Sequence, residues 1–146
     1  MEPIQAILEQ KGREVHVVAR DATVLDAVGT MCRAHVGAVL VMEGDQLCGI
    51  FSERDLMSRV VLAGKDPATT PVAAVMTADV TSIAPDIPAH DAMALMTNRR
   101  VRHLPVAEGR RIVGLVSIGD LVRWTLHDRE AEIAHLQDYV SGRYPG

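Results

Sequence analysis

The stretch that decides the fold is Gly-Ile-Phe-Ser-Glu-Arg-Asp at residues 49–55, which recurs as Gly-Leu-Val-Ser-Ile-Gly-Asp at residues 114–120. Sliding the chain by 65 residues aligns the two stretches and extends the match, without a gap, from residues 15–60 to residues 80–125. In this alignment 14 of 46 positions are identical. Identity at that level in one unbroken register indicates an internal tandem duplication.

Each copy predicts one helix early in the repeat. Apolar residues recur at helical spacing over residues 24–31 and again over residues 89–96. Thr23 stands just before the first of these segments, with Asp26 three residues later, which is the pattern of a capping box. We therefore expect Thr23 to begin the first helix.

Each copy also predicts three strands and a second helix. The continuous apolar runs at residues 36–42 and 101–107 suit strands that are buried on both faces. Glycine-containing turns follow them, and then further strands at residues 47–51 and 112–116. With a short leading strand and a closing helix, the repeat reads strand, helix, strand, strand, helix.

A repeat of about 50 residues is too small to bury a sufficient core alone. We therefore expect a mixed α+β or α/β fold, with two β-α-β-β-α repeats packed sheet to sheet as one pseudo-twofold module and a cleft between them. A connector rich in Pro, Thr and Ala at residues 64–75 divides the chain into residues 1–66 and 67–146. Short amphipathic helices are expected to flank the repeats at residues 3–11 and 129–140.

Composition narrows the class of protein. The formal net charge is −4, so the chain as a whole lacks the positive charge typical of nucleic-acid-binding proteins. The one local cluster of basic residues in the sequence is at residues 98–103. No apolar run approaches the roughly 20 residues that span a bilayer, and the first ten residues lack the pattern of a secretory signal. Cys32 and Cys48 lie in apolar segments, where buried free thiols are expected rather than a disulfide or a metal site. These features favour the cytoplasm.

The duplicated motifs resemble the CBS-domain family, whose tandem pairs are called Bateman modules. Residues 49–55 and 114–120 both fit the family's glycine-hydrophobic-x-Ser/Thr-x-x-Asp signature, and residues 102–106 are similar to its second-repeat strand. The resemblance covers nearly the whole chain, including both flanking helices, and is nearest to small bacterial stand-alone CBS proteins. It implies a regulatory module that binds adenine nucleotides and carries no covalent cofactor.

The resemblance assigns roles to the motif residues. In the family the aspartate holds the ribose and the serine or threonine lies nearby, so Asp55 and Asp120 become candidate ribose ligands, assisted by Ser52 and Ser117. A purely structural role is equally open, because a serine at a strand-to-helix junction with an aspartate three residues later forms a capping box. The two roles do not exclude each other.

The family also packs adenine between the leading strand and the next apolar strand. Carried onto this chain, one set of residues is expected to serve the second site, together with Asp120: Val80, Thr81, Ser82, Leu104 and Pro105. The matching set is expected to serve the first site: Val15, His16, Val17, Val39 and Leu40.

A nucleotide phosphate requires cations. Arg102 and His103 resemble a pair that contacts phosphate in nucleotide-sensing subunits of the AMP-activated kinase type, and Arg54 could reach the same cleft. The alternative is that this basic run is a solvated helix end. Because the first copy has Gly37 and Ala38 opposite Arg102 and His103, we expect two clefts of unequal affinity.

The resemblance therefore predicts a sensor that prefers AMP, then ATP or ADP, then NAD(H), and passes its occupancy to a separate regulated protein. S-adenosylmethionine is a further alternative, although it carries no phosphate for the cations. A dimerisation module without ligand is the second alternative, with the apolar stripes at residues 24–31 and 89–96 as its surface. The sequence lacks a nucleophile elbow, a phosphate loop and metal-ligand spacing, which argues against an enzyme.

Overall fold

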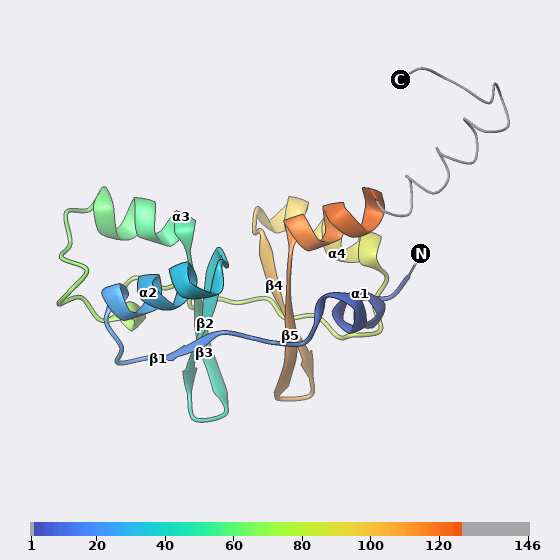
Figure 1. Cartoon of the computed structure of the whole chain (residues 1–146), viewed down its shortest axis with the longest axis horizontal. Coiled ribbons are helices and arrows are strands. Elements are labelled where there is room, and N and C mark those ends of the chain that lie inside the picture. The colour runs from blue at the N-terminus through green and yellow to red at the C-terminus, as the bar shows by residue number, and fades with distance from the viewer. Residues whose placement is uncertain (1, 127–146) are drawn as a thin grey trace, which may run out of the picture.

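Two small sheets, one in each copy of the repeat, form the centre of the fold (Figure 1). The computed structural model describes residues 2–126. In the first repeat, a three-stranded sheet and its helices follow the predicted order: β1 Val17–Ala19, α2 Val24–Ala34, β2 Ala38–Glu43, β3 Gln46–Ser52 and α3 Glu53–Asp55, which continues as the π-helix η1 Leu56–Val61.

The second repeat contains a two-stranded sheet with the same antiparallel hairpin. Its elements are α4 Ala89–Arg99, β4 His103–Glu108, β5 Arg111–Ser117 and a helix at 118–126. Outside the repeats lie α1 Ile4–Lys11 and the short 3-10 helix η2 Val72–Ala74 in the connector. The predicted helix at residues 129–140 falls outside the described residues.

Local sequence explains where these elements begin and turn. The Thr23 hydroxyl accepts a hydrogen bond from the Asp26 N–H at 3.1 Å, and the Asp26 carboxylate accepts one from the Thr23 N–H at 3.2 Å. This confirms the predicted capping box. Both hairpins turn at a glycine in the left-handed region, Gly44 with φ of 59° and Gly109 with φ of 62°, where a side chain would be strained.

The leading strand forms in the first repeat but not in the second. In the first repeat β1 pairs with β2 in parallel, and the Leu40 N–H donates to the His16 carbonyl at 3.0 Å. The equivalent of Leu40 in the second repeat is Pro105, which has no N–H to donate. The prediction of a strand at residues 80–82 is therefore wrong, and a single parallel bridge joins Ile83 to Val106 instead.

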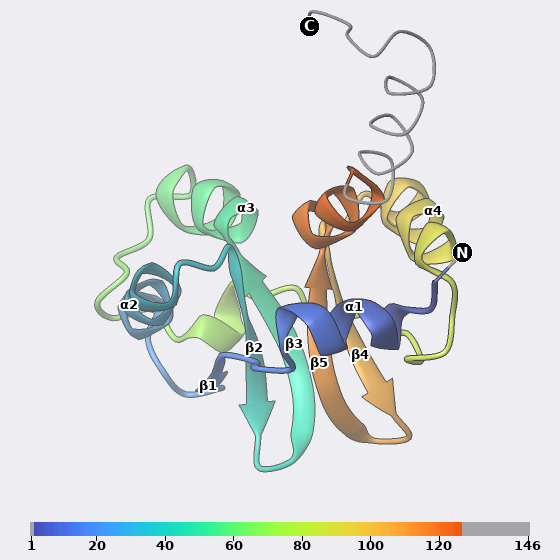
Figure 2. The same cartoon turned by 45° about the vertical axis from the view of Figure 1, so that its right-hand side comes forward.

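The core is divided into two apolar clusters, one for each repeat. In the first, Phe51 and Val39 are fully buried, and Val24 and Met31 pack from α2. The second is built around residues such as Leu104 and Val116, and it also contains three side chains of α1: Ile4, Ile7 and Leu8. The N-terminal helix thus packs against the second repeat, although it precedes the first in the chain, and Figure 2 shows it crossing beside β5.

Burial corrects two predictions. The apolar residues at helical spacing in α2 and α4 face their own repeat cores, since Ala27 and Ala92 are completely buried. These stripes cannot supply a dimerisation surface. Cys48 is partly buried, but Cys32 is exposed, so the expectation that both thiols are buried is wrong for Cys32; both are free.

No helix within residues 2–126 is long and apolar enough to cross a membrane.

Candidate functional site

A cavity of about 750 Å³ lies where the two repeats meet. We call it the Asp55 cleft. The first repeat contributes Ser52, Arg54 and Asp55 from the β3–α3 junction, and the second contributes residues 79–81 and residues 99–104. Apolar side chains that also line the cleft include Ile50, Val80, Val101, Leu104 and Ile118. Its volume falls within the range of small-molecule sites, and its lining combines apolar walls with a few polar groups.

Four arginines line the Asp55 cleft, against three carboxylates from Glu53, Asp55 and Asp79. Arg54 donates to the Arg100 carbonyl at 3.2 Å, and Arg99 donates to the Thr81 hydroxyl at 3.0 Å. The Arg102 side chain makes no hydrogen bond or ion pair with any other residue between 2 and 126. Its guanidinium is therefore available to a bound anion.

The Asp55 carboxylate lines this cleft and accepts its hydrogen bonds from neutral donors. Its Oδ2 accepts from the Ser52 N–H at 3.0 Å and the Ser52 hydroxyl at 3.1 Å, and its Oδ1 accepts from the Thr77 hydroxyl at 3.0 Å. The nearest cation is Arg59, whose Nε lies 3.8 Å from Oδ1. Ser52 and Asp55 thus form the predicted capping box, and the carboxylate still lines the cleft.

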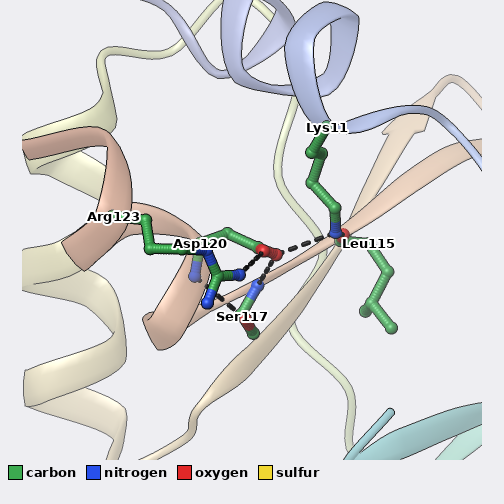
Figure 3. A network of polar contacts seen from close by, with 5 residues as sticks. All are labelled: Lys11, Leu115, Ser117, Asp120 and Arg123. Carbon is green, nitrogen blue, oxygen red and sulfur yellow. Dashed lines mark hydrogen bonds and ion pairs between the residues drawn. The ribbon is translucent and has the colours of Figure 1, made fainter. Parts of the chain in front are cut away.

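Asp120 has a different environment (Figure 3). The Lys11 ammonium, at the end of α1, donates to Asp120 Oδ2 at 2.8 Å and to the Leu115 carbonyl at 2.7 Å. Arg123 donates to Oδ1 at 2.6 Å, and the Ser117 N–H donates to Oδ2 at 2.8 Å. Lys11, Asp120 and Arg123 line a second cavity of about 430 Å³, the Asp120 pocket, together with Ile7, Gln10, Trp124 and Leu126.

The structure changes the grouping that the sequence suggested. Val80, Thr81 and Leu104 lie in one cleft with Asp55, whereas Asp120 lines the other cavity. In this structure they are therefore grouped with Asp55, and a common site with Asp120 stays a prediction. The physical reason is the crossed arrangement of the repeats: the motif of the first repeat faces the leading segment of the second.

Other predicted residues fall in different places. Arg54, Arg102, His103, Ser52 and Ser117 all line the Asp55 cleft, so the three predicted cations meet in one place. Neither cavity is lined by Pro105 or Ser82, nor by the residues proposed for adenine in the first site: Val15, His16, Val17, Val39 and Leu40. The His16 Nε2 lies 3.8 Å from Glu14 Oε1 instead.

Sequence reasoning missed the ligand role open to Arg99 and Arg100, and it missed Lys11 entirely. Arg99 ends α4, Arg100 follows it as the C-cap residue with a φ of 56°, and both line the Asp55 cleft. In the 65-residue register of the repeat, Lys11 aligns with Met76, and Gly12 aligns with Thr77.

Burial and charge set the protonation of two side chains at the site. Burial lowers the pKa of His103 below its ordinary value, although Asp120 and Glu53 act in the opposite direction. His103 is therefore neutral at pH 7. Burial by itself raises the pKa of Asp120, but hydrogen bonds from Lys11 and Ser117 outweigh it and hold that pKa below its ordinary value.

Replacing Lys11 with Met should reduce stability at neutral pH by about 1 kcal/mol, since a charged hydrogen bond is lost at a partly exposed site. A lowered folded-state pKa stabilises the fold above the unfolded value, about pH 4, and that contribution disappears as pH falls through the folded-state pKa. The difference between wild type and variant should therefore shrink between pH 7 and pH 3. Urea denaturation across this range measures it, with Lys65→Met, at the chain's other lysine, as control. A difference that does not change with pH would contradict the assignment.

The described residues contain no group of three His, Cys, Asp or Glu side chains placed to hold a metal ion.

Comparison with known proteins places the chain in a family. The model of the CBS domain matches residues 12–62 and residues 72–127, which are the two repeats. The chain belongs to the CBS-domain family. A CBS domain-containing mitochondrial protein of Arabidopsis thaliana, CBSX3, is 38% identical over 129 residues, covering 85% of this chain. The chain spans 63% of the length of that relative.

Solved CBS-domain structures match the fold closely. A protein with CBS domains from Burkholderia ambifaria MC40-6 superimposes with a TM-score of 0.83 at 40% identity, covering 86% of this chain and 95% of that one. The CBS domain protein PAE2072 from Pyrobaculum aerophilum, solved in complex with AMP, has a TM-score of 0.72 at 21% identity, covering 81% and 88%. At that identity the second likeness concerns the fold alone.

Proposed function

We propose that the chain is a regulatory CBS module that binds an adenine nucleotide in the Asp55 cleft, with AMP preferred over ATP, ADP and NAD(H). The observation that carries this proposal is the meeting of a buried carboxylate, Asp55, with Arg102 and His103 across one cavity. A carboxylate can accept both hydroxyl protons of a ribose, and a guanidinium pairs with phosphate. The AMP complex of the Pyrobaculum protein, on the same fold, supports this choice of ligand.

The dimensions of the cleft support a nucleotide of this kind. Adenine is expected to lie against the apolar wall formed by Val80, Val101 and Leu104, with ribose at Asp55 and phosphate toward the arginines. The excess of arginine over carboxylate in the lining favours a phosphate-bearing ligand. S-adenosylmethionine would leave these cations without a partner, so we place it after the nucleotides.

The mechanism we propose is a population shift. A ligand that contacts both repeats at once favours the arrangement of the repeats in which both sets of contacts form. A separate protein then reads that arrangement, so the module would report cellular energy status to a partner rather than catalyse a reaction. In this mechanism the nucleotide changes the affinity of the module for the partner. The partner must then change the affinity for the nucleotide by the same factor.

We also propose that two copies associate through the helices that follow each motif. Large apolar side chains are exposed there: Met57, Val61, Leu62, Val122 and Leu126. These replace the α2 and α4 stripes, which the repeat cores bury. Sedimentation equilibrium should give twice the mass of one chain, and a single-chain mass at micromolar concentration would rule the dimer out.

Thermal denaturation with a panel of ligands tests the proposed function. At about 100 times its dissociation constant, AMP should stabilise the fold by about 2.7 kcal/mol and raise the midpoint by about 5–10 °C. Adenosine, which lacks the phosphate, should give a clearly smaller shift. The same assay with ADP, ATP, NAD(H) and S-adenosylmethionine ranks the ligands. If no ligand moves the midpoint, the chain is better explained as a dimerisation module.

A further inference from the structure

The two motif aspartates are the buried charged residues of the described chain, yet their carboxylates are satisfied differently. Asp55 is 6% exposed and Asp120 is 8% exposed. Asp55 accepts its hydrogen bonds from neutral groups, Ser52 and Thr77. Asp120 accepts from two cations, Lys11 and Arg123, in addition to its own motif serine. The two carboxylates occupy equivalent positions in the repeat, but cations hydrogen-bond directly to Asp120, whereas the cation beside Asp55, Arg59, lies 3.8 Å away.

The fold fixes Lys11 at this position. Ile4, Ile7 and Leu8 anchor α1 in the core of the second repeat, and Gly114 allows the helix to approach β5 closely. A Cβ atom added to Gly114 would lie 2.7 Å from Leu8 Cδ2. The helix ends at Lys11, so its ammonium projects from an anchored element rather than from a free chain end.

Lys11 occupies the position that a ligand of the Asp120 pocket would need. To bind at Asp120, a ribose diol must donate to oxygens that already accept from the Lys11 ammonium and the Arg123 guanidinium. Hydrogen bonds between two charged groups are roughly twice as strong as those between neutral groups. A neutral diol therefore competes poorly there, whereas at Asp55 it competes with the neutral Thr77 hydroxyl and with the longer ion pair to Arg59, whose Nε lies 3.8 Å from Oδ1.

We propose that Lys11 is a built-in competitor that keeps nucleotide from the Asp120 pocket, so that each chain binds a single nucleotide at Asp55. This inference rests on the proposed function. It predicts that removing the ammonium uncovers a second, weaker site, because the Ser117 N–H still orients the carboxylate. The second site is weaker because Arg123 is the one arginine among the described residues that line the Asp120 pocket, whereas four arginines line the Asp55 cleft.

Isothermal titration calorimetry with AMP tests this inference. The wild type and Lys65→Met should bind one AMP per chain, and Lys11→Met should bind two, the second more weakly. Lys11→Met combined with Asp120→Asn should return to one. Circular dichroism confirms folding, and Lys11→Ala, which shortens the side chain further, should repeat the result of Lys11→Met.

The outcomes separate this inference from the proposed function. If the wild type and Lys11→Met both bind one AMP, the competitor role of Lys11 is wrong and the proposed function stands. Two AMP molecules on the wild type would likewise overturn the competitor role alone. If AMP binds only after Lys11 is replaced, the competitor role stands and the assignment to Asp55 fails. Binding to none of the variants overturns both.

Discussion

Replacing Phe51 with Ala lowers the free energy of unfolding by about 3–5 kcal/mol, the usual cost of truncating a buried aromatic side chain. Phe51 is completely buried in the core of the first repeat, among residues that include Val24, Val39 and Val60. A fold of this size has a total stability of only about 5–15 kcal/mol. The variant should therefore lose a large part of its stability, and the site built on the same strand should be weakened with it.

Urea denaturation measures this effect as a lower midpoint with little change in slope. Leu25→Ala is the matched control, because Leu25 is 55% exposed and its truncation should change stability by no more than about 0.5 kcal/mol. Equal losses from the two truncations would contradict the assignment of Phe51 to the core.

Replacing Asp55 with Asn should weaken AMP binding about 100-fold, because one charged acceptor of the ribose hydroxyls becomes a donor. The matched variant is Asp120→Asn, which makes the same change at the equivalent position of the other motif. Since Asp120 lies outside the Asp55 cleft, this variant should bind AMP with nearly wild-type affinity. Isothermal titration calorimetry on both proteins measures the difference.

The amide keeps the size of the side chain and one oxygen acceptor, so Asp55→Asn should preserve the helix start at Ser52. Far-ultraviolet circular dichroism checks this. If Asp120→Asn loses binding while Asp55→Asn retains it, the nucleotide occupies the Asp120 pocket, and the assignment made here is wrong.

The local elements of this fold follow from the sequence because their causes are local. Alternating and continuous apolar runs, glycine turns and Ser-x-x-Asp caps act within a few residues, and they predicted both hairpins and the helix starts. The exception is the leading strand of the second repeat. There a single proline, Pro105, lacks the N–H that would pair the leading segment with β4, as Leu40 pairs with His16 in the first repeat. The prediction followed the similarity of the repeats and did not take this difference into account.

The composition of the site could be predicted only in part, because it depends on contacts across the chain. The motif residues and the basic residues Arg54, Arg102 and His103 were predicted from the sequence, and the structure brings them to one cleft. Which aspartate they accompany depends on how the repeats face each other, and that is set by long-range packing. Lys11 reaches Asp120 across 109 residues of sequence, and no local pattern marks such a contact.

The most direct test of the central claim is a crystal structure of the protein grown with AMP. We expect electron density for AMP in the Asp55 cleft, with the ribose hydroxyls within hydrogen-bonding distance of Asp55 and the phosphate beside Arg102 and His103. Density at Asp120 with Lys11 displaced, and none beside Asp55, would contradict it.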